Sequence, residues 1–543
     1  MNGIDALGMG LRLTGSLAAG TSIPGGVART SAAMARLQQQ IALGRAMLSP
    51  GDDPIRSAVL SRLAGATVAD GRIRAAIERA VSLLEASDPF IAESVDLIDR
   101  ARDMGLQGRD SSTLQSDRDS LADQLDQVID RLLQVSNATH DGVHLFGGTR
   151  TRMPAFERLA EGVAWMGRGA GMDVGAGDLA TISGDRLLGG ESGREDFIRA
   201  VNLSNGWETP LAGFAAGGLG QIRISVGQQV RTVDLSNAVT IRDFANLVEG
   251  LGLGVRVEMD QPTGRVWIRN GLSGASLSIQ NVGADDTASR LGIRTFDLDT
   301  RLAEFNDGRG VRFSQPGVDP VTGEPANLNG NDLSIRLHDG RTFVVDFTTE
   351  STVGEVIATV NAAATAAGVN VPGEFSIGLQ TGTNGFLLTD NTGGPFSFEV
   401  NPVDNGWAAL DLGIKAGTSG AQIAGEDRAT IAVDGAFTHL LRLRDALRAN
   451  DAAGMTFAIE GLDRAFERAS SARTLAGARS ARFQDERTVS EERAVQNESL
   501  RSSLEDLDVA DAATRLSSLS TQLQAGLLAI GRTSTLSLLD FLR

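Results

Sequence analysis

The sequence predicts an α+β protein: a long α-helical rod from paired N- and C-terminal helices, with an inserted β-rich lobe of two similar α+β modules. Three observations predict this. Residues from about 27 to 141 and from about 430 to 543 carry helical apolar patterns. The middle of the chain is instead rich in Gly, Thr, Val and Asn, and it contains an internal duplication.

The first predicted helix carries one stripe of apolar or small residues whose members alternate three and four apart, as in a coiled coil. The stripe comprises Val27, Thr30, Met34, Leu37, Ile41, Gly44 and Leu48. After an interruption from Pro50 to Pro54, two further helices are predicted to join near Gly105 to Ser111. Their stripes are Ile91, Val95 and Ile98, then Leu121, Leu125, Val128, Leu132 and Val135.

The C-terminal region mirrors this pattern. One long continuous helix is predicted by the stripe Met455, Ile459, Leu462, Phe466, Ala469, Ala476 and Phe483. A last stripe runs through Leu504, Leu516, Leu519, Leu523, Leu527 and Ile530 into the apolar tail Leu536, Leu538, Leu539, Phe541 and Leu542. Because a stripe needs a partner helix, we expect the stripes of the two ends to bury each other.

The duplication is visible as two similar segments. Val233-Asp234-Leu235, leading to Thr240, is matched by Val345-Asp346-Phe347, leading to Thr352. Each copy is predicted to form strand, turn, strand, then helix. Further matches are Arg265 to Ile268 with Gly385 to Leu388, and Ala288 to Ile293 with Ala409 to Ile414.

These patterns divide the chain into eight predicted parts. The N-terminal side has an assembly helix region, half of the helical rod, and a connecting, partly β region, at 1–66, 67–150 and 151–218. The inserted lobe has module 1, a linker and module 2, at 219–300, 301–327 and 328–420. The C-terminal side has the other half of the rod and a second assembly helix, at 430–490 and 491–543.

Composition excludes several classes of function. With 50 Lys+Arg against 68 Asp+Glu, the net charge of −18 argues against nucleic acid and anionic membrane surfaces as partners. The absence of Cys excludes disulfides and thiolate chemistry. No segment has the length of apolar sequence that a membrane span requires. A cleavable signal peptide is not expected, because Asp5 replaces a basic leader and Arg12 splits the apolar region.

Four motifs invite a chemical interpretation, and each is incomplete. His140 and His144 have the spacing of a helical zinc pair, but Asp141-Gly142 between them predicts a turn. The Gly-rich run from Gly167 to Gly177 lacks the ending of a phosphate loop and is expected to be a flexible connection. Gly271 to Ala275 misses the spacing of a nucleophile elbow.

Asp297 and Asp299 resemble the opening of a calcium loop, but Arg301 stands at the next ligand position. The sequence therefore predicts no catalytic, cofactor-binding or metal site. The predicted site is an assembly interface on the terminal stripes, with an intramolecular coiled coil as the simpler alternative. Its residues are Met34, Leu37, Ile41, Leu48, Leu516, Leu519, Leu523, Leu527, Ile530, Leu538 and Phe541.

Both terminal regions resemble a known family. Leu37 to Arg45, followed by Leu48-Ser49-Pro50-Gly51-Asp52-Asp53-Pro54, is similar to the N-terminal signature of the bacterial flagellar hook-filament junction family, hook-associated protein 3, in the flagellin superfamily. Flagellins typically lack the final Asp-Asp-Pro. Other matching segments are Ile98 to Met104, Val135 to Asn137, Asp141-Gly142, Leu145 to Thr149, Gly477 to Arg479, Leu504 to Asp508, Ala513 to Leu516 and Leu536 to Leu542.

The sequence also departs from the family near its start. Gly and Pro residues weaken a helix that the family normally forms there, so the sequence leaves the start of the first helix open. They are Gly8, Gly10, Gly15, Gly20, Pro24, Gly25 and Gly26.

The resemblance implies a non-enzymatic structural protein of the extracellular flagellum, exported without a cleavable signal peptide. The implied partners are other copies in a ring, a neighbouring hook-associated junction protein on the hook side, and flagellin or another hook-associated protein on the filament side. The flagellar export apparatus and an export chaperone are also implied. No cofactor, nucleic acid or membrane is expected.

Two alternatives remain open at the level of sequence. One is a flagellin proper, a filament subunit with an enlarged surface domain. The other is a filament-borne adhesin whose lobe binds a glycan or a surface, a role for which exposed aromatic residues are needed. The candidates are Trp165, Trp207, Trp267 and Trp407, of which Trp267 is predicted to lie in a strand and in the core.

Overall fold

The structure is a computed structural model that describes residues 14–541, except 191, 196–205, 212–217, 261–264, 320–322, 324–325, 327 and 405. For 14–24, 192–195, 260, 265 and 533–541 it describes the backbone alone. The chain divides into two compact units. Unit 1 comprises Met1–Glu78 and Arg482–Arg543, and unit 2 comprises Arg79–Ala481.

Both ends of the chain are helical, as the apolar stripes predict. The N-terminal helices are α1 (Thr14–Leu43), α2 (Pro54–Arg109) and α3 (Gln115–Ser136). The C-terminal helices are α10 (Ala436–Ala449), α11 (Ala452–Glu505) and α12 (Val509–Phe541). The predicted long helix from Met455 to Phe483 is confirmed within α11. Among the described residues, no helix is both long and apolar enough to span a bilayer.

Three boundaries differ from the sequence prediction. Helix α1 ends at Leu43, because Gly44 adopts a left-handed conformation with φ +67° and stops the helix, so Gly44 and Leu48 do not continue its stripe. The joint between α2 and α3 lies at residues 110–114. The last stripe is split, because Leu504 belongs to α11 and the chain leaves the helix before α12 begins at Val509.

The described residues before 27 are helical. Helix α1 begins at Thr14, so its backbone includes Gly15, Gly20 and Pro24 despite their low helix propensity. Gly8 and Gly10, like Asp5 and Arg12 of the signal-peptide argument, lie outside the described residues.

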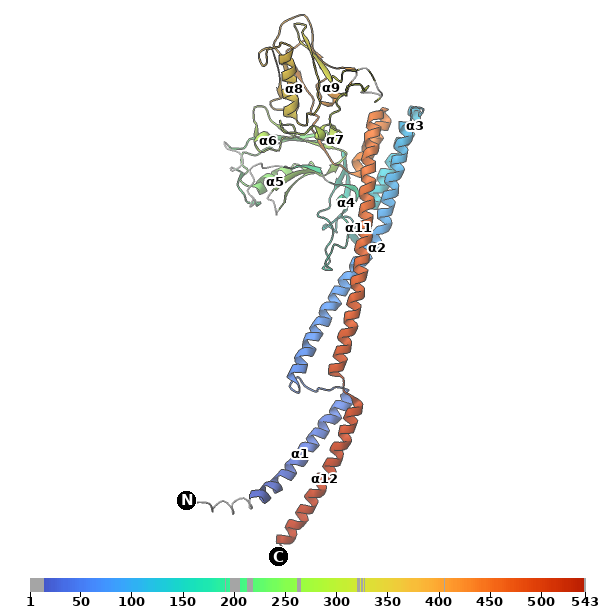
Figure 1. Cartoon of the computed structure of the whole chain (residues 1–543), viewed down its shortest axis with the longest axis vertical. Coiled ribbons are helices and arrows are strands. Elements are labelled where there is room, and N and C mark those ends of the chain that lie inside the picture. The colour runs from blue at the N-terminus through green and yellow to red at the C-terminus, as the bar shows by residue number, and fades with distance from the viewer. Residues whose placement is uncertain are drawn as a thin grey trace, which may run out of the picture. The chain divides into compact units, whose positions relative to one another are not determined.

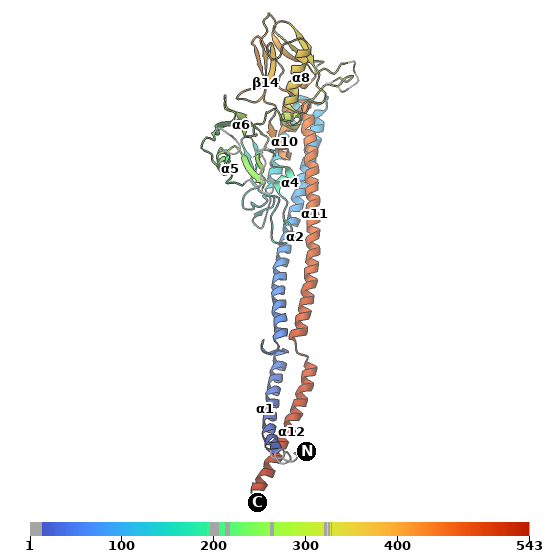
Figure 2. The ribbon, with the colours of Figure 1, turned by 60° about the vertical axis from the view of Figure 1, so that its left-hand side comes forward.

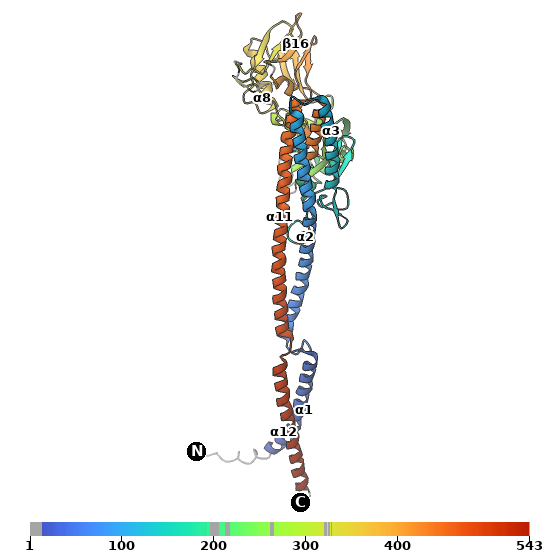
Figure 3. The ribbon, with the colours of Figure 1, turned by 90° about the vertical axis from the view of Figure 1, so that its right-hand side faces the viewer.

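In unit 2, four helical segments pack together around a core of buried side chains, and Figure 3 shows α2, α3 and α11 side by side. Gly105 and Gly108 let α2 approach its neighbours closely. A Cβ at Gly105 would lie 2.8 Å from Ile459 of α11, and one at Gly108 would lie 2.2 Å from Leu447 of α10. Ion pairs on the surface join the same helices, including Arg102 with Asp463 at 3.2 Å.

Short strands follow the helices. Hairpin β1 (Thr139–His140) and β2 (Val143–His144) turns at Asp141-Gly142, both with positive φ, so the predicted turn is confirmed. Strands β3 (Phe156–Leu159) and β4 (Gly162–Trp165) form a sheet with β10 (Leu272–Ser273) of the lobe. Helix α4 (Gly184–Leu188) is capped by the Ser183 side chain.

The first half of the lobe contains two antiparallel sheets. A four-stranded sheet has the order β19-β11-β6-β7, and a three-stranded sheet has the order β5-β9-β8. The elements are β5 (Ser192–Glu195), β6 (Gln221–Val226), β7 (Gln229–Asp234), α5 (Ile241–Glu249), β8 (Val255–Asp260), β9 (Arg265–Asn270), β11 (Ser276–Asn281), α6 (Thr287–Arg290) and β19 (Ile431–Ala432).

The second half repeats this arrangement. Its sheets have the orders β13-β12-β16-β17 and β14-β15-β18. Figure 2 shows α5 and α8, each beside the strands of its own half. The elements are β12 (Leu333–Arg336), β13 (Thr342–Val345), α8 (Val353–Ala366), β14 (Phe375–Leu379), β15 (Phe386–Asp390), β16 (Phe398–Pro402), α9 (Ala408–Asp411), β17 (Ala416–Thr418) and β18 (Gln422–Ala424).

The matched sequence positions take matched structural roles. Helices α5 and α8 both begin in a capping box, formed by Thr240 with Asp243 and by Thr352 with Glu355. After α6 and α9, left-handed glycines at Gly292 (φ +70°) and Gly413 (φ +72°) turn the chain in the same way. The repeated element order supports the proposed division of the lobe into two modules.

Two features of the modules are not apparent in the sequence. Module 1 is completed by strands from outside it, β5 before it and β19 after module 2. The predicted linker also contributes to the core of module 2, because Leu302 and Phe305 are buried there. Here α7 (Phe305–Gly308) follows a short 3₁₀ turn at Leu302–Glu304.

A buried polar network joins the two modules. Arg294, after α6, donates from Nε to Asn384 Oδ1 at 3.1 Å and from Nη2 to the Thr383 carbonyl at 2.7 Å. Asn384 in turn donates to Thr295 Oγ1 of module 1 at 2.8 Å. The side chains of Arg294, Thr295 and Asn384 are almost fully buried. Each module therefore supplies hydrogen-bond partners to buried polar groups of the other.

Candidate assembly surface

The predicted assembly stripes meet in unit 1, where α1 and α12 run side by side in opposite directions (Figure 1). At one end the Leu507 N–H donates to the Gly44 carbonyl at 3.0 Å. At the other end Gly526 faces Val27, and a Cβ at Gly526 would lie 2.8 Å from a Val27 methyl group. These two contacts place residues 27–44 beside residues 507–526.

The residues that face each other repeat three and four apart on both helices, as in a coiled-coil seam. All are half-buried. On α1 they are Val27, Thr30, Met34, Leu37 and Ile41, and on α12 they are Leu516, Leu519, Leu523, Gly526 and Ile530. Seven of the eleven predicted interface residues are therefore half-buried on these two helices, and their part in assembly stays a prediction.

Two predicted interface residues, Leu48 and Leu527, lie outside this seam, and two more are described by their backbone alone. Leu48 is half-buried in the loop after α1. Leu527 is 53% exposed, because the heptad places Gly526 and not Leu527 in the seam. Leu538 and Phe541 have a helical backbone on α12, and their side chains lie outside the described residues.

The loop between α1 and α2 is closed by the Asp-Asp-Pro segment. Asp52 Oδ2 accepts hydrogen bonds from the Leu48 and Ser49 N–H groups at 2.9 and 3.0 Å, and Arg36 forms an ion pair with Asp52. The two backbone donors lower the pKa of Asp52 to about 2. Asp53 Oδ1 accepts from the Arg56 N–H at 3.0 Å in the first turn of α2. Both aspartates therefore fix the path between the helices.

Unit 1 has little core and much exposed apolar surface. Its buried apolar residues among those described are Leu63, Ala76, Ile77, Phe483 and Ala512. Large apolar side chains on its surface are Leu43, Ile55, Val68, Ile73, Val489, Val495, Leu500, Val509, Leu527 and Leu528. We call this second set the outward apolar residues. Exposed apolar side chains in such number, on helices that lack a core, are typical of a surface that assembly covers.

Within unit 1, the contact between α2 and α11 is partly polar. Asn497 Nδ2 of α11 donates to Asp70 Oδ2 of α2 at 3.1 Å. Ser490 is buried on α11. Polar groups between two helices add less to their pairing than a Leu or Ile seam does, because hydrogen bonding to water is given up. These segments are therefore weakly paired.

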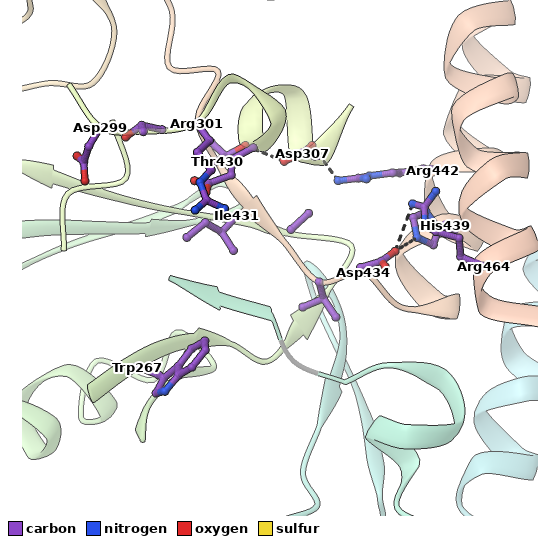
Figure 4. A pocket seen from close by; sticks show the side chains of 15 residues that line it. Trp267, Asp299, Arg301, Asp307, Thr430, Ile431, Asp434, His439, Arg442 and Arg464 are labelled. Carbon is purple, nitrogen blue, oxygen red and sulfur yellow. Dashed lines mark hydrogen bonds and ion pairs between the residues drawn. The ribbon is translucent and has the colours of Figure 1, made fainter. Parts of the chain in front are cut away.

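A cavity of about 800 Å³ in unit 2 is lined by charged side chains that form ion pairs and hydrogen bonds (Figure 4). Asp307 lies 2.8 Å from Arg442 of α10 and accepts from Thr430 Oγ1 at 2.7 Å. Asp434 lies 2.6 Å from His439 Nε2 and 3.5 Å from Arg464 of α11. These pairs fasten the chain segments entering and leaving module 2 to α10 and α11.

The His439 ring holds the pKa of Asp434 well below its usual range, and burial lowers the pKa of His439 itself. Asp434 is therefore a charged hydrogen-bond acceptor that contacts both α10 and α11. Asp299 and Arg301, from the predicted calcium-loop comparison, line the same cavity on an exposed loop. Among the described residues, no group of three or more His, Cys, Asp or Glu side chains could hold a metal ion.

The other candidate residues named from the sequence form hydrogen bonds within the protein or are buried. His140 Nε2 lies 3.0 Å from Ser82 Oγ, and His144 Nδ1 lies 3.2 Å from the Asn137 carbonyl. In the run from Gly167 to Gly177, which is predicted to be a flexible connection, the Met172 carbonyl accepts from the Ala180 N–H at 2.7 Å. In the segment from Gly271 to Ala275, Ser273 is fully buried.

The predicted core position of Trp267 is wrong. Trp267 lies in β9 as expected, but the strand alternation directs Val266 and Ile268 inward and leaves Trp267 half-buried on the other face. The Arg269 guanidinium lies over its ring at 4.7 Å. Trp407 has Arg312 over its ring at 4.0 Å.

The sequences of the two helical ends match known protein families. Residues 18–151 match the bacterial flagellin N-terminal helical region, and residues 459–542 match the bacterial flagellin C-terminal helical region. Together they cover less than half of the chain and include both helices of the α1/α12 seam. No curated protein matches the chain.

Several solved structures are similar to this chain. Flagellar hook-associated protein 3 from Legionella pneumophila is 12% identical, with 82% of this chain and 98% of that chain covered and a TM-score of 0.37. FlgL from Xanthomonas campestris is 13% identical, with 82% and 99% covered and a TM-score of 0.34. The flagellar junction protein FlgL from Legionella pneumophila is 12% identical, with 75% and 93% covered and a TM-score of 0.31. On its two matched helical regions, the chain is therefore similar to the bacterial flagellins.

Proposed function

We propose that this protein is a structural subunit of the bacterial flagellum that joins the hook to the filament and templates the addition of flagellin. The observation that carries the proposal is unit 1 itself: flagellin-type helices that pair through the α1/α12 seam yet keep the outward apolar residues exposed. Such a unit gains stability when copies of it pack laterally. The chain has no catalytic role in this proposal.

The choice of a junction protein over a flagellin rests on Asp52-Asp53-Pro54 and on the tail from Leu536 to Leu542. The structure gives the first of these motifs a definite task. Asp52 and Asp53 close the loop that leads from α1 into α2, so they set where the seam helix is attached. A flagellin lacking this motif would need another way to hold the loop.

The proposed partners follow from this role. Other copies of the chain complete a ring through the outward apolar residues. A hook-associated junction protein contacts the ring on the hook side, and flagellin or another hook-associated protein contacts it on the filament side. Before assembly, the export apparatus and an export chaperone handle the chain, which functions outside the cell.

A clean deletion in the native bacterium tests this role. We expect electron microscopy to show bare hooks, and the culture medium to contain unpolymerised flagellin, with both reversed by the wild-type gene. Bare hooks without shed flagellin would instead identify the chain as the filament subunit. Normal filaments would contradict the junction role.

A further inference from the structure

Unit 1 contains the first part of α2 and the last part of α11, and these two segments differ in charge. Residues 54–78 of α2 carry four arginines and two acidic residues, whereas residues 482–505 of α11 carry six acidic residues and four arginines. Three arginines of the α2 segment, Arg62, Arg72 and Arg74, form no ion pair with a described residue. The α2 segment therefore carries positive charge that its own subunit does not neutralise.

Most acidic residues of the α11 segment are paired with arginines of the same helix. The pairs are Arg482 with Glu486, Arg487 with Glu491, Arg501 with Glu498 and Arg501 with Glu505. Asp485 and Glu492 are exposed, and neither forms an ion pair with a described residue. The α11 segment therefore carries negative charge that its own subunit does not neutralise.

The unpaired charges lie on the outer sides of the two helices. Arg72 is nine residues after the buried Leu63, and nine residues at about 3.6 per turn place two side chains on opposite sides of a helix. The same spacing separates Glu492 from the buried Phe483. Asp485 is seven residues before Glu492 and therefore lies on the same side of α11.

Apolar residues flank these charges. Val68, 58% exposed, lies one turn before Arg72, and Val489, 44% exposed, lies one turn after Asp485. Arg62, ten residues before Arg72, is exposed on the same half of α2. Exposed ion pairs add little free energy to a contact, but opposite charges determine which surfaces meet because like charges repel. Each helix therefore offers apolar contact area together with one sign of charge.

We propose that these two surfaces meet between neighbouring copies of the chain. The basic face of α2 comprises Arg62, Val68 and Arg72, and it packs against the acidic face of α11 in the next copy, which comprises Asp485, Val489 and Glu492. The inference rests on the proposed function and adds to it which surfaces meet. Because the two faces differ, the contact is head-to-tail, so it can be repeated around a ring.

Charge reversal in the native bacterium tests the contact. Arg62→Glu with Arg72→Glu makes both faces acidic, and Asp485→Arg with Glu492→Arg makes both faces basic. Each double variant should be incorporated into hook-filament structures at least about tenfold less than wild type, because like charges then meet. The variant with all four changes has complementary faces again, so its incorporation should be within about twofold of wild type.

A matched control reverses two arginines of unit 2. Arg152→Glu with Arg231→Glu changes exposed positions and should leave incorporation unchanged. Immunogold labelling measures incorporation, immunoblotting of the culture medium measures export, and circular dichroism of each purified variant measures folding.

Three results would overturn the inference, and the first two leave the proposed function intact. One is normal incorporation of the double variants. Another is loss of incorporation in the variant with all four changes, because the faces would then meet a different protein. Absence of the wild-type protein from hook-filament structures would overturn the proposed function and this inference with it.

Discussion

At the scale of single residues, Gly461 shows how closely α11 approaches α10. A Cβ at this position would lie 2.0 Å from Nδ1 of the His439 ring, which is 1% exposed and held at Asp434. A buried ring cannot move aside cheaply, because the surrounding interior is already close-packed. The absence of a side chain at Gly461 is therefore a packing requirement.

We expect Gly461→Ala to lower the free energy of unfolding by about 1–3 kcal/mol, because overpacking outweighs the better helix propensity of Ala. Gly477→Ala is the matched control in the same helix, where an added Cβ meets nothing within 4 Å. The control should be neutral or stabilising by up to about 1 kcal/mol. Urea denaturation measures both, and equal effects would contradict the packing argument.

Asp332 gives a pH dependence at the same scale. Burial raises the pKa of its carboxyl group to about 6, although the N–H groups of Ser314 and Phe347 donate to its oxygens at 2.6 and 2.7 Å. The folded state therefore binds this proton more tightly than the unfolded chain does. The contribution to stability is present at pH values below about 4 and is lost as the pH rises to about 6.

We expect Asp332→Asn to remove this pH-dependent contribution to the free energy of unfolding. In the wild type it changes by on the order of 3 kcal/mol between pH 4 and pH 6. The side-chain NH₂ group of Asn would also face one of the two backbone N–H donors. This lowers the free energy of unfolding by an amount that does not change with pH. The difference in unfolding free energy between wild type and variant should therefore change between pH 4 and pH 6. Parallel curves in urea denaturation would mean that the pKa of Asp332 is ordinary.

At the scale of elements, periodic patterns made much of the fold predictable. The stripe on α1 and the long stripe on α11 are local in sequence, so their spacing alone predicts the helices. The duplication predicts two similar modules for the same reason. Strands β5 and β19 could not be predicted, because they pair with β9 and β11 across long stretches of intervening chain.

The candidate site was predictable to a similar extent. Leu516, Leu519 and Leu523 stand out as large apolar residues, whereas Gly526 does not, although it occupies the next seam position. Leu527 was predicted in its place because apolar character was the criterion.

The seam leads to a prediction about assembly. Leu523→Asp places a charge against α1 and should reduce incorporation into the flagellum at least about tenfold, while the modules stay folded. The control is Thr521→Asp, because Thr521 is exposed on the same helix. Immunogold labelling of isolated hook-filament structures measures incorporation, and circular dichroism measures folding. Normal incorporation of Leu523→Asp would show that assembly does not require the α1/α12 seam.

At the scale of the whole molecule, the two units differ in how they gain stability. Unit 2 buries many apolar side chains from its helices and from both modules, whereas unit 1 buries few among its described residues. Stability therefore differs between them, and local opening is expected to be far easier in unit 1.

Limited proteolysis of the isolated protein tests this difference. We expect early cleavage before roughly residue 65 and after roughly residue 495, because the terminal helices lack their assembly partners, and a resistant core that includes both modules. Mass spectrometry of the fragments identifies the sites. Termini that survive as long as the core would show that unit 1 is stable alone.

The exchange of hydrogen bonds between Arg294, Thr295 and Asn384 also affects how the lobe can change during evolution. Loss of one module would leave buried donors and acceptors of the other without partners, at a cost of about 1–3 kcal/mol for each group. Module 1 would in addition have to recover β19 across a new junction. Insertions and deletions in this lobe should therefore be inherited as the whole pair, while loops at the tips vary in length independently.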